Sequence, residues 1–552
     1  MNERHFAHWP RRLPRSLAYP RVPLFELAET SARRYPDRTA MIFYGRKISH
    51  GEYWQTVERL AGALARLGVE KGDRVALYLQ NTPHFAIGFM GILRANAVVV
   101  PLNPMLTGEE AAGLLADSGA KVLITTADLY PKAETACQQA GVEKIIVGNA
   151  ADYLPQEPEL DVPAGMEEAA PVPEDAIGWN GFLENAPAAP PVQVTAGDLA
   201  LLPFTAGSTG VPKGCRHTHA TVLTNVWGSI FWSTATPSSV MLAALPFFHV
   251  TGLIHSFLAP VAIGGTFVIM TRWNRATALD AIERYGVTSW ANITTMVIDL
   301  LAAPDIDDRD LSSLVFVGGG GAPLPAAVGE RLEQKTGLVY AEGYGLTETI
   351  SQTHWNPPDA PRLGSIGIPV FDVDARIVDV TGEAELPVGE QGEIVVSGPQ
   401  VFEGYWNKPE ETEAVFFELD GKRFFRTGDI ARMDEDGFFH IVDRKKRMIN
   451  AAGFKVWPAE VEAILYRHPA VLEACVVGVP DPVRVENVKA FIVRRPGHED
   501  VTAEAIIEWA KGQMAAYKYP RLIQFVESLP KSGAGKIQWR KLQEQERAAR
   551  ND

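Results

Sequence analysis

Cysteine is scarce in this sequence. The chain has 552 residues and three cysteines, Cys137, Cys215 and Cys475, which lie far apart and match no metal-ligand spacing. This usage argues against a disulfide framework and against a cysteine-based zinc site. It favours a reducing cytoplasm as the location.

The sequence also lacks an apolar stretch suited to a membrane. Its N-terminal segment, residues 1–16, is basic but has no apolar core of the kind that a signal peptide requires. The most apolar stretch, residues 85–102, is interrupted by Arg94 and Asn96. The glycines and alanines of this stretch predict a buried helix and strand rather than a membrane span. We therefore expect no transmembrane segment.

An excess of basic residues is missing as well. The chain has 52 Lys and Arg residues against 67 Asp and Glu residues, which gives a formal net charge of -15. Nucleic-acid binding needs a basic face, so general affinity for nucleic acid is not expected. A local basic site for an anionic cofactor is still compatible with this charge. At 46% hydrophobic and 22% charged residues, the composition is that of a soluble globular protein.

Helical and extended patterns alternate from residue 24 to about residue 147. Apolar residues recur at helical spacing over residues 53–67, and Gly68 follows as a C-terminal cap. Thr107 and Glu110 form a capping box, and residues 122–125 and 145–147 are short buried strands. Such alternation predicts an α/β fold, with parallel sheets covered by helices.

The later part of the chain divides further. Residues 151–195, rich in Pro, Ala and Glu, predict a surface loop, and residues 378–443 predict a β-rich subdomain. Pro458 marks a helix start, strands follow at 474–479 and 488–493, and a helix is expected at 502–516. We expect a large N-terminal body, residues 1–442, a hinge at 443–447, and a small mobile α+β lid, residues 448–552.

The clearest chemical signal is residues 205–214, TAGSTGVPKG. Glycines allow close backbone approach, N–H groups can surround an anion, and a lysine supplies charge, so the segment predicts a polyphosphate loop. It differs from the P-loop of common NTPases, because Pro212 precedes Lys213 and Gly214 follows it. The candidate phosphate-binding residues are Thr205, Ala206, Gly207, Ser208, Thr209, Gly210 and Lys213.

Further short motifs follow in order: LPFFH at 245–249, GGGGAP at 318–323, YGLTE at 344–348, RTGD at 426–429, AGFKVWP at 452–458 and KSGAGKI at 531–537. Taken alone, most of them would be ordinary turns. Together with residues 205–214 they resemble the adenylate-forming superfamily, which includes acyl-CoA synthetases, aryl-CoA ligases, luciferases and peptide-synthetase adenylation domains. The resemblance extends from about residue 24 to residue 542.

The resemblance implies a role for each motif. The Tyr344 ring stacks on adenine, the Thr347 hydroxyl contacts the α-phosphate, and Glu348 binds Mg²⁺. Asp429 accepts hydrogen bonds from both ribose hydroxyls, and Lys536 stabilises charge while the adenylate forms. The catalytic residues implied are Thr347, Glu348, His249 at the acyl pocket and Lys536, with the hinge at Lys446. The further cofactor-binding residues implied are Gly320, Gly321, Ala322, Pro323, Glu342, Gly343, Arg444, Gly453, Phe454, Lys455 and Trp457.

Three positions depart from the usual pattern. Ala206 replaces a common Ser, Asn450 stands where many relatives carry Lys, and Val485 occupies a position that is often Gly. These changes put one phosphate contact, one AMP contact and one CoA contact in doubt, whereas the central residues are intact.

The implied reaction uses ATP, Mg²⁺ and coenzyme A. A small-molecule carboxylic acid and ATP give an acyl-adenylate and pyrophosphate, and CoA then gives acyl-CoA and AMP. Because little chain follows Lys536, we expect free CoA rather than a carrier domain as acceptor. The phrasing of the C-terminal motifs is similar to that of medium- and long-chain fatty acyl-CoA synthetases.

Alternatives stay open at this point. An aryl-CoA ligase for acids such as benzoate or cinnamate is the nearest one, because both groups share His249. A catalytically dead nucleotide-binding protein and a P-loop phosphotransferase belong to other classes. Peripheral membrane contact and a homodimer are also open.

Overall fold

The structure is a computed structural model, and it describes residues 3–205, 212–451, 454–481, 485–531 and 537–548. The chain divides into two compact units. Unit 1 comprises Met1–Ala375, Val396–Phe425 and Asp436–Phe438, and unit 2 comprises Arg376–Val395, Arg426–Glu435 and Phe439–Asp552. Each unit is described by itself below.

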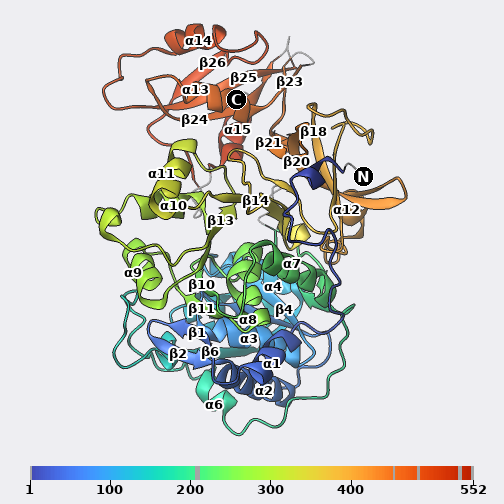
Figure 1. Ribbon diagram of the computed structural model, residues 1–552, viewed down its shortest axis with the longest axis vertical. Helices are drawn as coiled ribbons and strands as arrows, with labels where there is room; N and C mark the ends of the chain where they lie inside the picture. The colour runs from blue at the N-terminus through green and yellow to red at the C-terminus, as the bar shows by residue number, and fades with distance from the viewer. Residues whose placement is uncertain (1–2, 206–211, 452–453, 482–484, 532–536, 549–552) are drawn as a thin grey trace. The chain divides into compact units, whose positions relative to one another are not determined.

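One mainly parallel sheet of unit 1 is covered by helices on both faces. In β3, Val75 and Leu77 point into one apolar core, while Ala76 and Tyr78 point into another, as expected for alternating side chains of a strand. Helices α2 (His50–Arg66) and α3 (Pro83–Arg94) pack into the first core, and α4 (Gly108–Ser118) and α5 (Tyr130–Ala140) pack into the second. Figure 1 labels α2, α3 and α4. The sheet order is β7 (Ile177–Gly178), β6 (Lys144–Gly148), β5 (Ala120–Thr126), β3 (Arg74–Tyr78), β4 (Val98–Leu102), β8 (Leu199–Leu201) and β9 (His217–Thr218).

The second sheet of unit 1 carries the motif residues at its carboxyl edge. Its order is β16 (Ile368–Pro369), β15 (Ser351–Trp355), β14 (Ala341–Leu346), β13 (Phe316–Gly320), β12 (Ser289–Ile293), β10 (Val240–Ala243), β11 (Thr266–Ile269), β1 (Thr39–Phe43) and β2 (Arg46–Ser49). The strands from β14 to β1 pair in parallel, and β15, β16 and β2 are antiparallel. Parallel strands bring their carboxyl ends to one edge, which is where α/β proteins place ligands.

Helices of unit 1 begin and end largely where the sequence predicts. The capping box of Thr107 and Glu110 is present, and the expected helix–strand pair at 85–102 is α3 followed by β4. The helices are α1 (Glu26–Arg34), α2 (His50–Arg66), α3 (Pro83–Arg94), α4 (Gly108–Ser118), α5 (Tyr130–Ala140), α6 (Trp179–Leu183), α7 (His219–Trp232), α8 (Ala259–Ile263), α9 (Arg275–Tyr285), α10 (Thr294–Leu301), α11 (Ala326–Thr336) and α12 (Pro409–Glu413). A π-helix, η3, spans Gly252–Leu258.

A third sheet contains the predicted β-rich segment. Its order is β17 (Asp374–Val378), β18 (Gln391–Ser397), β20 (Lys422–Met433) and β19 (Phe416–Leu419), with β21 (Phe439–Arg444) paired to β20. Along the chain, the division between the units falls within β17, β18 and β20.

The fourth sheet and its helices form the C-terminal part of unit 2. The sheet order is β23 (Phe454–Val456), β22 (Ile449–Ala451), β25 (Val485–Arg494) and β24 (Val471–Asp481), with β26 (Leu522–Phe525) on β25. The helices are α13 (Pro458–Leu465), α14 (Ala503–Lys511) and α15 (Trp539–Ala548). The predicted helix start at Pro458 is confirmed, since Pro458 is the first residue of α13.

Two local predictions were wrong. The helix expected at 502–516 ends at Lys511, because Gly512 follows and glycine is a poor helix former. The segment 151–195, expected to be a loop throughout, contains β7 and α6; Trp179 of α6 is buried in the main core, and this burial outweighs the weak local pattern. The fold class itself is confirmed as α/β with a large body and a small C-terminal α+β part. In the described part of the chain, every helix is too short or too polar to cross a bilayer.

Candidate active site

The two ends of the predicted phosphate loop are held together by backbone pairing. The Thr205 N–H donates to the Lys213 carbonyl oxygen over 2.9 Å, and the Lys213 N–H donates to Thr205 Oγ1 over 3.2 Å. Phe204 and Gly214 form an antiparallel bridge next to them. Ala206, Gly207, Ser208, Thr209 and Gly210 lie outside the described residues, so their contacts with phosphate stay predictions. The two described ends of the segment thus form a closed neck.

Lys213 and Glu348 meet at one side chain that the sequence did not single out, Tyr405. The Tyr405 hydroxyl donates to Glu348 Oε1 over 2.9 Å, and the Lys213 Nζ lies 4.7 Å from the centroid of the Tyr405 ring. Tyr405 is 8% exposed. Burial, together with the Glu348 carboxylate, raises the pKa of Tyr405, so its hydroxyl stays protonated as a donor. A lone tyrosine in GYWNKP carries no motif signal, which is why only the structure reveals it.

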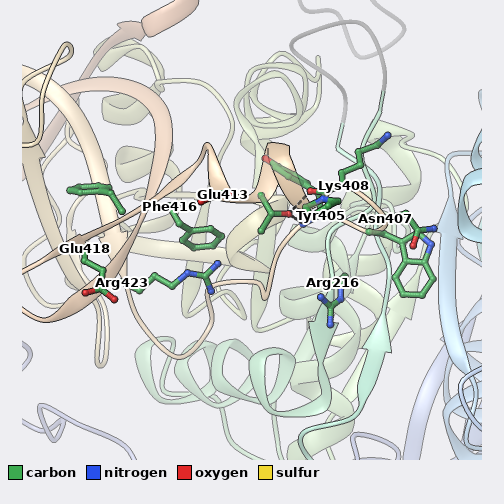
Figure 2. Close-up of a pocket in the computed structure, with 12 residues that line it drawn as sticks. Arg216, Tyr405, Asn407, Lys408, Glu413, Phe416, Glu418 and Arg423 are labelled. Atoms are coloured by element: carbon green, nitrogen blue, oxygen red, sulfur yellow. Dashed lines mark hydrogen bonds between the residues drawn. The ribbon is translucent and has the colours of Figure 1, made fainter.

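Tyr405 also lines a cavity of about 690 Å³ in unit 1. Figure 2 shows Tyr405, Phe416, Lys408 and Arg423 around this cavity. The Arg423 guanidinium carbon lies 3.5 Å from the centroid of the Phe416 ring, a cation–π contact. The volume of the cavity is within the range of small-molecule sites. Glu413 and Glu418 line it as well, so the cavity carries charges of both signs.

The turn after β14 presents Thr347 and Glu348, and buried polar side chains fix it. His217 Nε2 donates to the Thr347 carbonyl oxygen over 2.8 Å, and burial lowers the His217 pKa to about 4, so this imidazole is neutral at pH 7. Asn225 Nδ2 donates to the carbonyl oxygens of Thr349 and Ile350 over 2.8 and 3.0 Å. Ile350 has a φ of 46°, a left-handed conformation that is strained for a β-branched residue. The backbone of the motif is thus held in one geometry.

Glycines allow the end of β13 to approach its neighbours β12 and β14 closely. A Cβ on Gly320 would lie 2.3 Å from the Gly343 carbonyl oxygen, and a Cβ on Gly319 would lie 1.9 Å from the Asn292 carbonyl oxygen. Gly320 and Gly343 are register partners in the two strands. Gly321 follows with a φ of +87°, so only glycine fits there without strain.

The residues that flank this glycine turn differ in exposure. Ala322 and Pro323 are exposed, and the Ala322 carbonyl oxygen accepts a hydrogen bond from Thr294 Oγ1 over 2.8 Å. Glu342 is buried with 3% exposure, and burial raises its pKa to about 7. Its Oε2 has no hydrogen-bond partner among the described residues. Tyr344 is half-buried, and its ring meets His354 edge-on at 5.8 Å.

His249 is exposed just before the π-helix η3. Its Nδ1 accepts a hydrogen bond from the Thr251 N–H over 3.4 Å. A Cβ on Gly252 would lie 2.2 Å from the Pro246 carbonyl oxygen, which requires glycine at the first residue of η3. Within η3, His255 bonds Ser229 Oγ over 2.7 Å and Ser351 Oγ over 3.1 Å. π-Helices are frequent at functional sites, and no sequence pattern predicts this one.

In unit 2, Asp429 and Arg444 are cross-strand partners of β20 and β21. Arg444 Nε lies 2.7 Å from Asp429 Oδ1, and the side chain of Asp429 is 4% exposed whereas that of Arg444 is 52% exposed. The structure therefore brings together Asp429, implied as the ribose contact, and Arg444, implied as a cofactor-binding residue. A short, charge-assisted contact of this kind fixes the carboxylate orientation.

Glu393, which the sequence did not single out, supports the same turn. Its side chain is 2% exposed, and its Oε1 accepts a hydrogen bond from the Gly428 N–H over 3.1 Å. Its Oε2 accepts from Arg426 Nη1 over 3.2 Å and from Lys445 Nζ over 2.9 Å. One buried carboxylate thus connects the RTGD turn with the residue next to Lys446.

The cofactor-binding residues implied at 453–457 differ in exposure. Phe454 is 56% exposed and stacks on Tyr517 with centroids 4.8 Å apart. Lys455 Nζ lies 4.0 Å from Asp379 Oδ2. Trp457 is buried in an apolar cluster with Ile430. Gly453 and Lys536 lie outside the described residues, and their roles stay predictions.

Glu348 is the residue assigned to Mg²⁺. Among the described residues, His, Cys, Asp and Glu side chains form no group of three or more arranged to hold a metal ion. Mg²⁺ is commonly bound through one or two carboxylates, substrate phosphates and water. Glu348 would hold the ion, and the ion would neutralise charge on the ATP phosphates.

Comparison with known proteins covers nearly the whole chain. A family model described as AMP-binding enzyme matches residues 28–406, and one described as AMP-binding enzyme C-terminal domain matches residues 460–536. A long-chain-fatty-acid–CoA ligase of Bacillus subtilis is 37% identical over 98% of this chain and 97% of its own length. A feruloyl-CoA synthase of Amycolatopsis is also 37% identical, over 92% and 95%. The crystal structure of ATP-bound MatB from Rhodopseudomonas palustris is similar with a TM-score of 0.81 and 28% identity, covering 94% of this chain and 98% of that one.

Proposed function

The chain belongs to the AMP-binding enzyme family, and from this membership we propose that it is an acyl-CoA synthetase that activates medium- or long-chain fatty acids. The chemistry of the family is an AMP-forming acid–thiol ligation that uses ATP, Mg²⁺ and coenzyme A. The observation that carries the proposal is the group Lys213, Tyr405 and Glu348. Lys213, which we assign to the phosphate oxygens, and Glu348, which we assign to Mg²⁺, both contact the Tyr405 side chain, and this arrangement supports the proposal.

In the first step, the substrate carboxylate attacks the α-phosphorus of ATP, and pyrophosphate leaves. We assign the β- and γ-phosphates to the loop around Lys213, Mg²⁺ to Glu348, and the α-phosphate to Thr347. Asp429 accepts hydrogen bonds from the ribose hydroxyls, and Lys536 balances the charge that develops between the two anions. In the second step, the CoA thiol attacks the acyl carbonyl of the adenylate, and AMP leaves.

The adenine and acyl groups are assigned to the carboxyl edge of β12–β14. The backbone of Gly320, Gly321 and Gly343, with Ala322 and Pro323, forms the wall for adenine, and Tyr344 supplies the stacking ring. Glu342 and His249 complete this assignment, the latter at the acyl pocket.

The hinge and the domain limits belong to the same proposal. We assign residues 1–442 to adenylation, 443–447 to the hinge, with Lys446 as its pivot, and 448–552 to the lid. Arg444 contacts the nucleotide phosphate, and Gly453, Phe454, Lys455 and Trp457 serve the CoA step. We also propose a cytoplasmic location, whereas peripheral membrane contact and a homodimer stay predictions.

The aliphatic substrate is supported by the motif phrasing and by the long-chain-fatty-acid–CoA ligase relative. The feruloyl-CoA synthase relative is equally identical at 37%, so an aryl-CoA ligase is the second candidate. These two candidates make opposite predictions about chain length. Each buried methylene adds up to about 0.8 kcal/mol of binding free energy until the pocket ends, whereas an aromatic pocket gains little from it.

The test is a panel of carboxylic acids assayed for CoA-dependent AMP formation. We expect kcat/KM to rise along the saturated fatty acids from octanoate, reach a maximum and then fall, with benzoate and cinnamate poorer substrates. High turnover of cinnamate or ferulate with a flat response to aliphatic length would establish the second candidate. Absence of acid-dependent pyrophosphate release across the panel would refute adenylation itself.

A further inference from the structure

We propose that Tyr405 is a positioning residue that holds the Mg²⁺-binding carboxylate of Glu348 and the phosphate-binding ammonium of Lys213 in place for the adenylation step. This inference rests on the proposed function, because it takes Glu348 as the metal ligand and Lys213 as the phosphate contact. It assigns a task to a side chain that no sequence motif marks.

The first part of the argument is the hydrogen bond to Glu348. The Tyr405 hydroxyl donates to Oε1 over 2.9 Å, and this bond fixes the rotation of a carboxylate that sits on a short turn after β14. Partners of this outer kind orient metal ligands, and removing them commonly weakens metal binding.

The second part is the contact with Lys213. The ammonium lies 4.7 Å from the Tyr405 ring centroid, which is within the range of a cation–π interaction. Lysine has a flexible stem, and the ring restricts where its charge can lie at the neck of the phosphate loop. The hydroxyl and the ring of one residue therefore act on two different charges.

Tyr405 is itself held firmly, as a positioning residue must be. Its N–H donates to Thr412 Oγ1 over 2.9 Å, and its ring packs edge-on against Phe402 at 4.9 Å. A backbone bridge connects Tyr405 with Cys215, two residues after Lys213. The chain that carries Tyr405 is thus tied directly to the chain that carries Lys213.

The separate tasks of hydroxyl and ring give the experiment its design. Tyr405→Phe removes the hydroxyl and keeps the ring, whereas Tyr405→Leu removes both. We expect Tyr405→Phe to raise the Mg²⁺ concentration for half-maximal pyrophosphate release about tenfold, with KM for MgATP at saturating Mg²⁺ changed less than about twofold. Tyr405→Leu should shift the Mg²⁺ requirement and raise KM for MgATP about threefold to tenfold as well.

Tyr285 supplies a matched control in the same unit. Its hydroxyl also donates to a glutamate, Glu159 Oε2, over the same distance of 2.9 Å, away from the motif residues. Tyr285→Phe should leave the Mg²⁺ requirement unchanged. Melting temperatures of the variants, measured alongside, separate positioning from loss of folded enzyme.

Two results would overturn the positioning role of Tyr405. An unchanged Mg²⁺ requirement in Tyr405→Phe, or an equal shift in Tyr285→Phe, overturns the inference while the wild-type enzyme remains an acid-activating ligase. If the wild-type protein releases no pyrophosphate with any acid, the proposed function fails first, and the two failures are distinguished in this way.

Discussion

Replacing Asp429 by alanine tests the proposed contact with the ribose of ATP. The side chain is 4% exposed and lies 2.7 Å from Arg444 Nε, so the substitution removes a buried acceptor and leaves a guanidinium without this partner. Losing charge-assisted hydrogen bonds to the ribose costs about 2–4 kcal/mol of binding free energy. This free energy corresponds to a loss of about 30-fold to 1,000-fold in kcat/KM for ATP. Because both half-reactions hold the nucleotide, we expect both to slow.

A second buried aspartate provides the control. Asp374 Oδ2 lies 2.7 Å from Lys422 Nζ, its side chain is 3% exposed, and its partner is 41% exposed. The pair matches Asp429 and Arg444 in length and burial but has no assigned role in ATP binding. Asp374→Ala should lower the melting temperature much as Asp429→Ala does and leave KM for ATP unchanged. The reasoning is refuted if Asp429→Ala keeps a wild-type kcat/KM for ATP, or if the two variants weaken ATP binding equally.

Three further predictions address other parts of the chain. Lys536→Ala should slow adenylate formation by a factor of at least about 10² and leave the reaction of preformed adenylate with CoA near the wild-type rate. Lys446→Pro should slow the reaction with CoA and leave adenylate formation near the wild-type rate. Equal slowing of both steps in both variants would contradict a separate lid position for each step. Glu342 has a folded pKa of about 7 against an ordinary 4.5, so its stabilising contribution is full below pH 4.5 and is lost as pH rises through 7. We compare the free energies of unfolding of the wild type and of Glu342→Gln, measured by urea titration at each pH. Between pH 4.5 and pH 7 the wild-type value should fall by at most about 3 kcal/mol relative to the variant. If the two free energies change with pH in the same way, Glu342 does not titrate in this range. Glu393→Gln should raise KM for ATP about tenfold and lower the melting temperature, because Arg426 then lacks its buried carboxylate; an unchanged KM would limit Glu393 to a folding role.

The sequence predicts the regular elements well because their signals are local. Caps such as Thr107 with Glu110 and the proline at the start of α13 act within one turn of a helix, and the structure has them where the sequence places them. The short β7 and α6 were missed because their stability comes from distant packing, with Trp179 buried in the main core. The local residue pattern of a segment cannot predict burial against residues that are distant along the chain.

The same distinction explains the candidate site. Lys213, Glu348 and Asp429 stand in short motifs, so the sequence alone predicts a chemical role for each of them. Tyr405 and Glu393 act through residues that are distant along the chain, Glu348 and Arg426 respectively. Only the folded arrangement shows what these two side chains hold.

Where Gly320 faces Gly343, one edge of the candidate site consists of peptide groups without side chains. Peptide groups are the same whatever residue is encoded, and any larger residue here would push the two strands apart. This edge is therefore closed to gradual change by point mutation. New acid preferences in a protein of this architecture must arise from side chains elsewhere, such as the exposed side chain of His249. The fold thus divides its site into a part that evolution can adjust and a part that it must inherit intact.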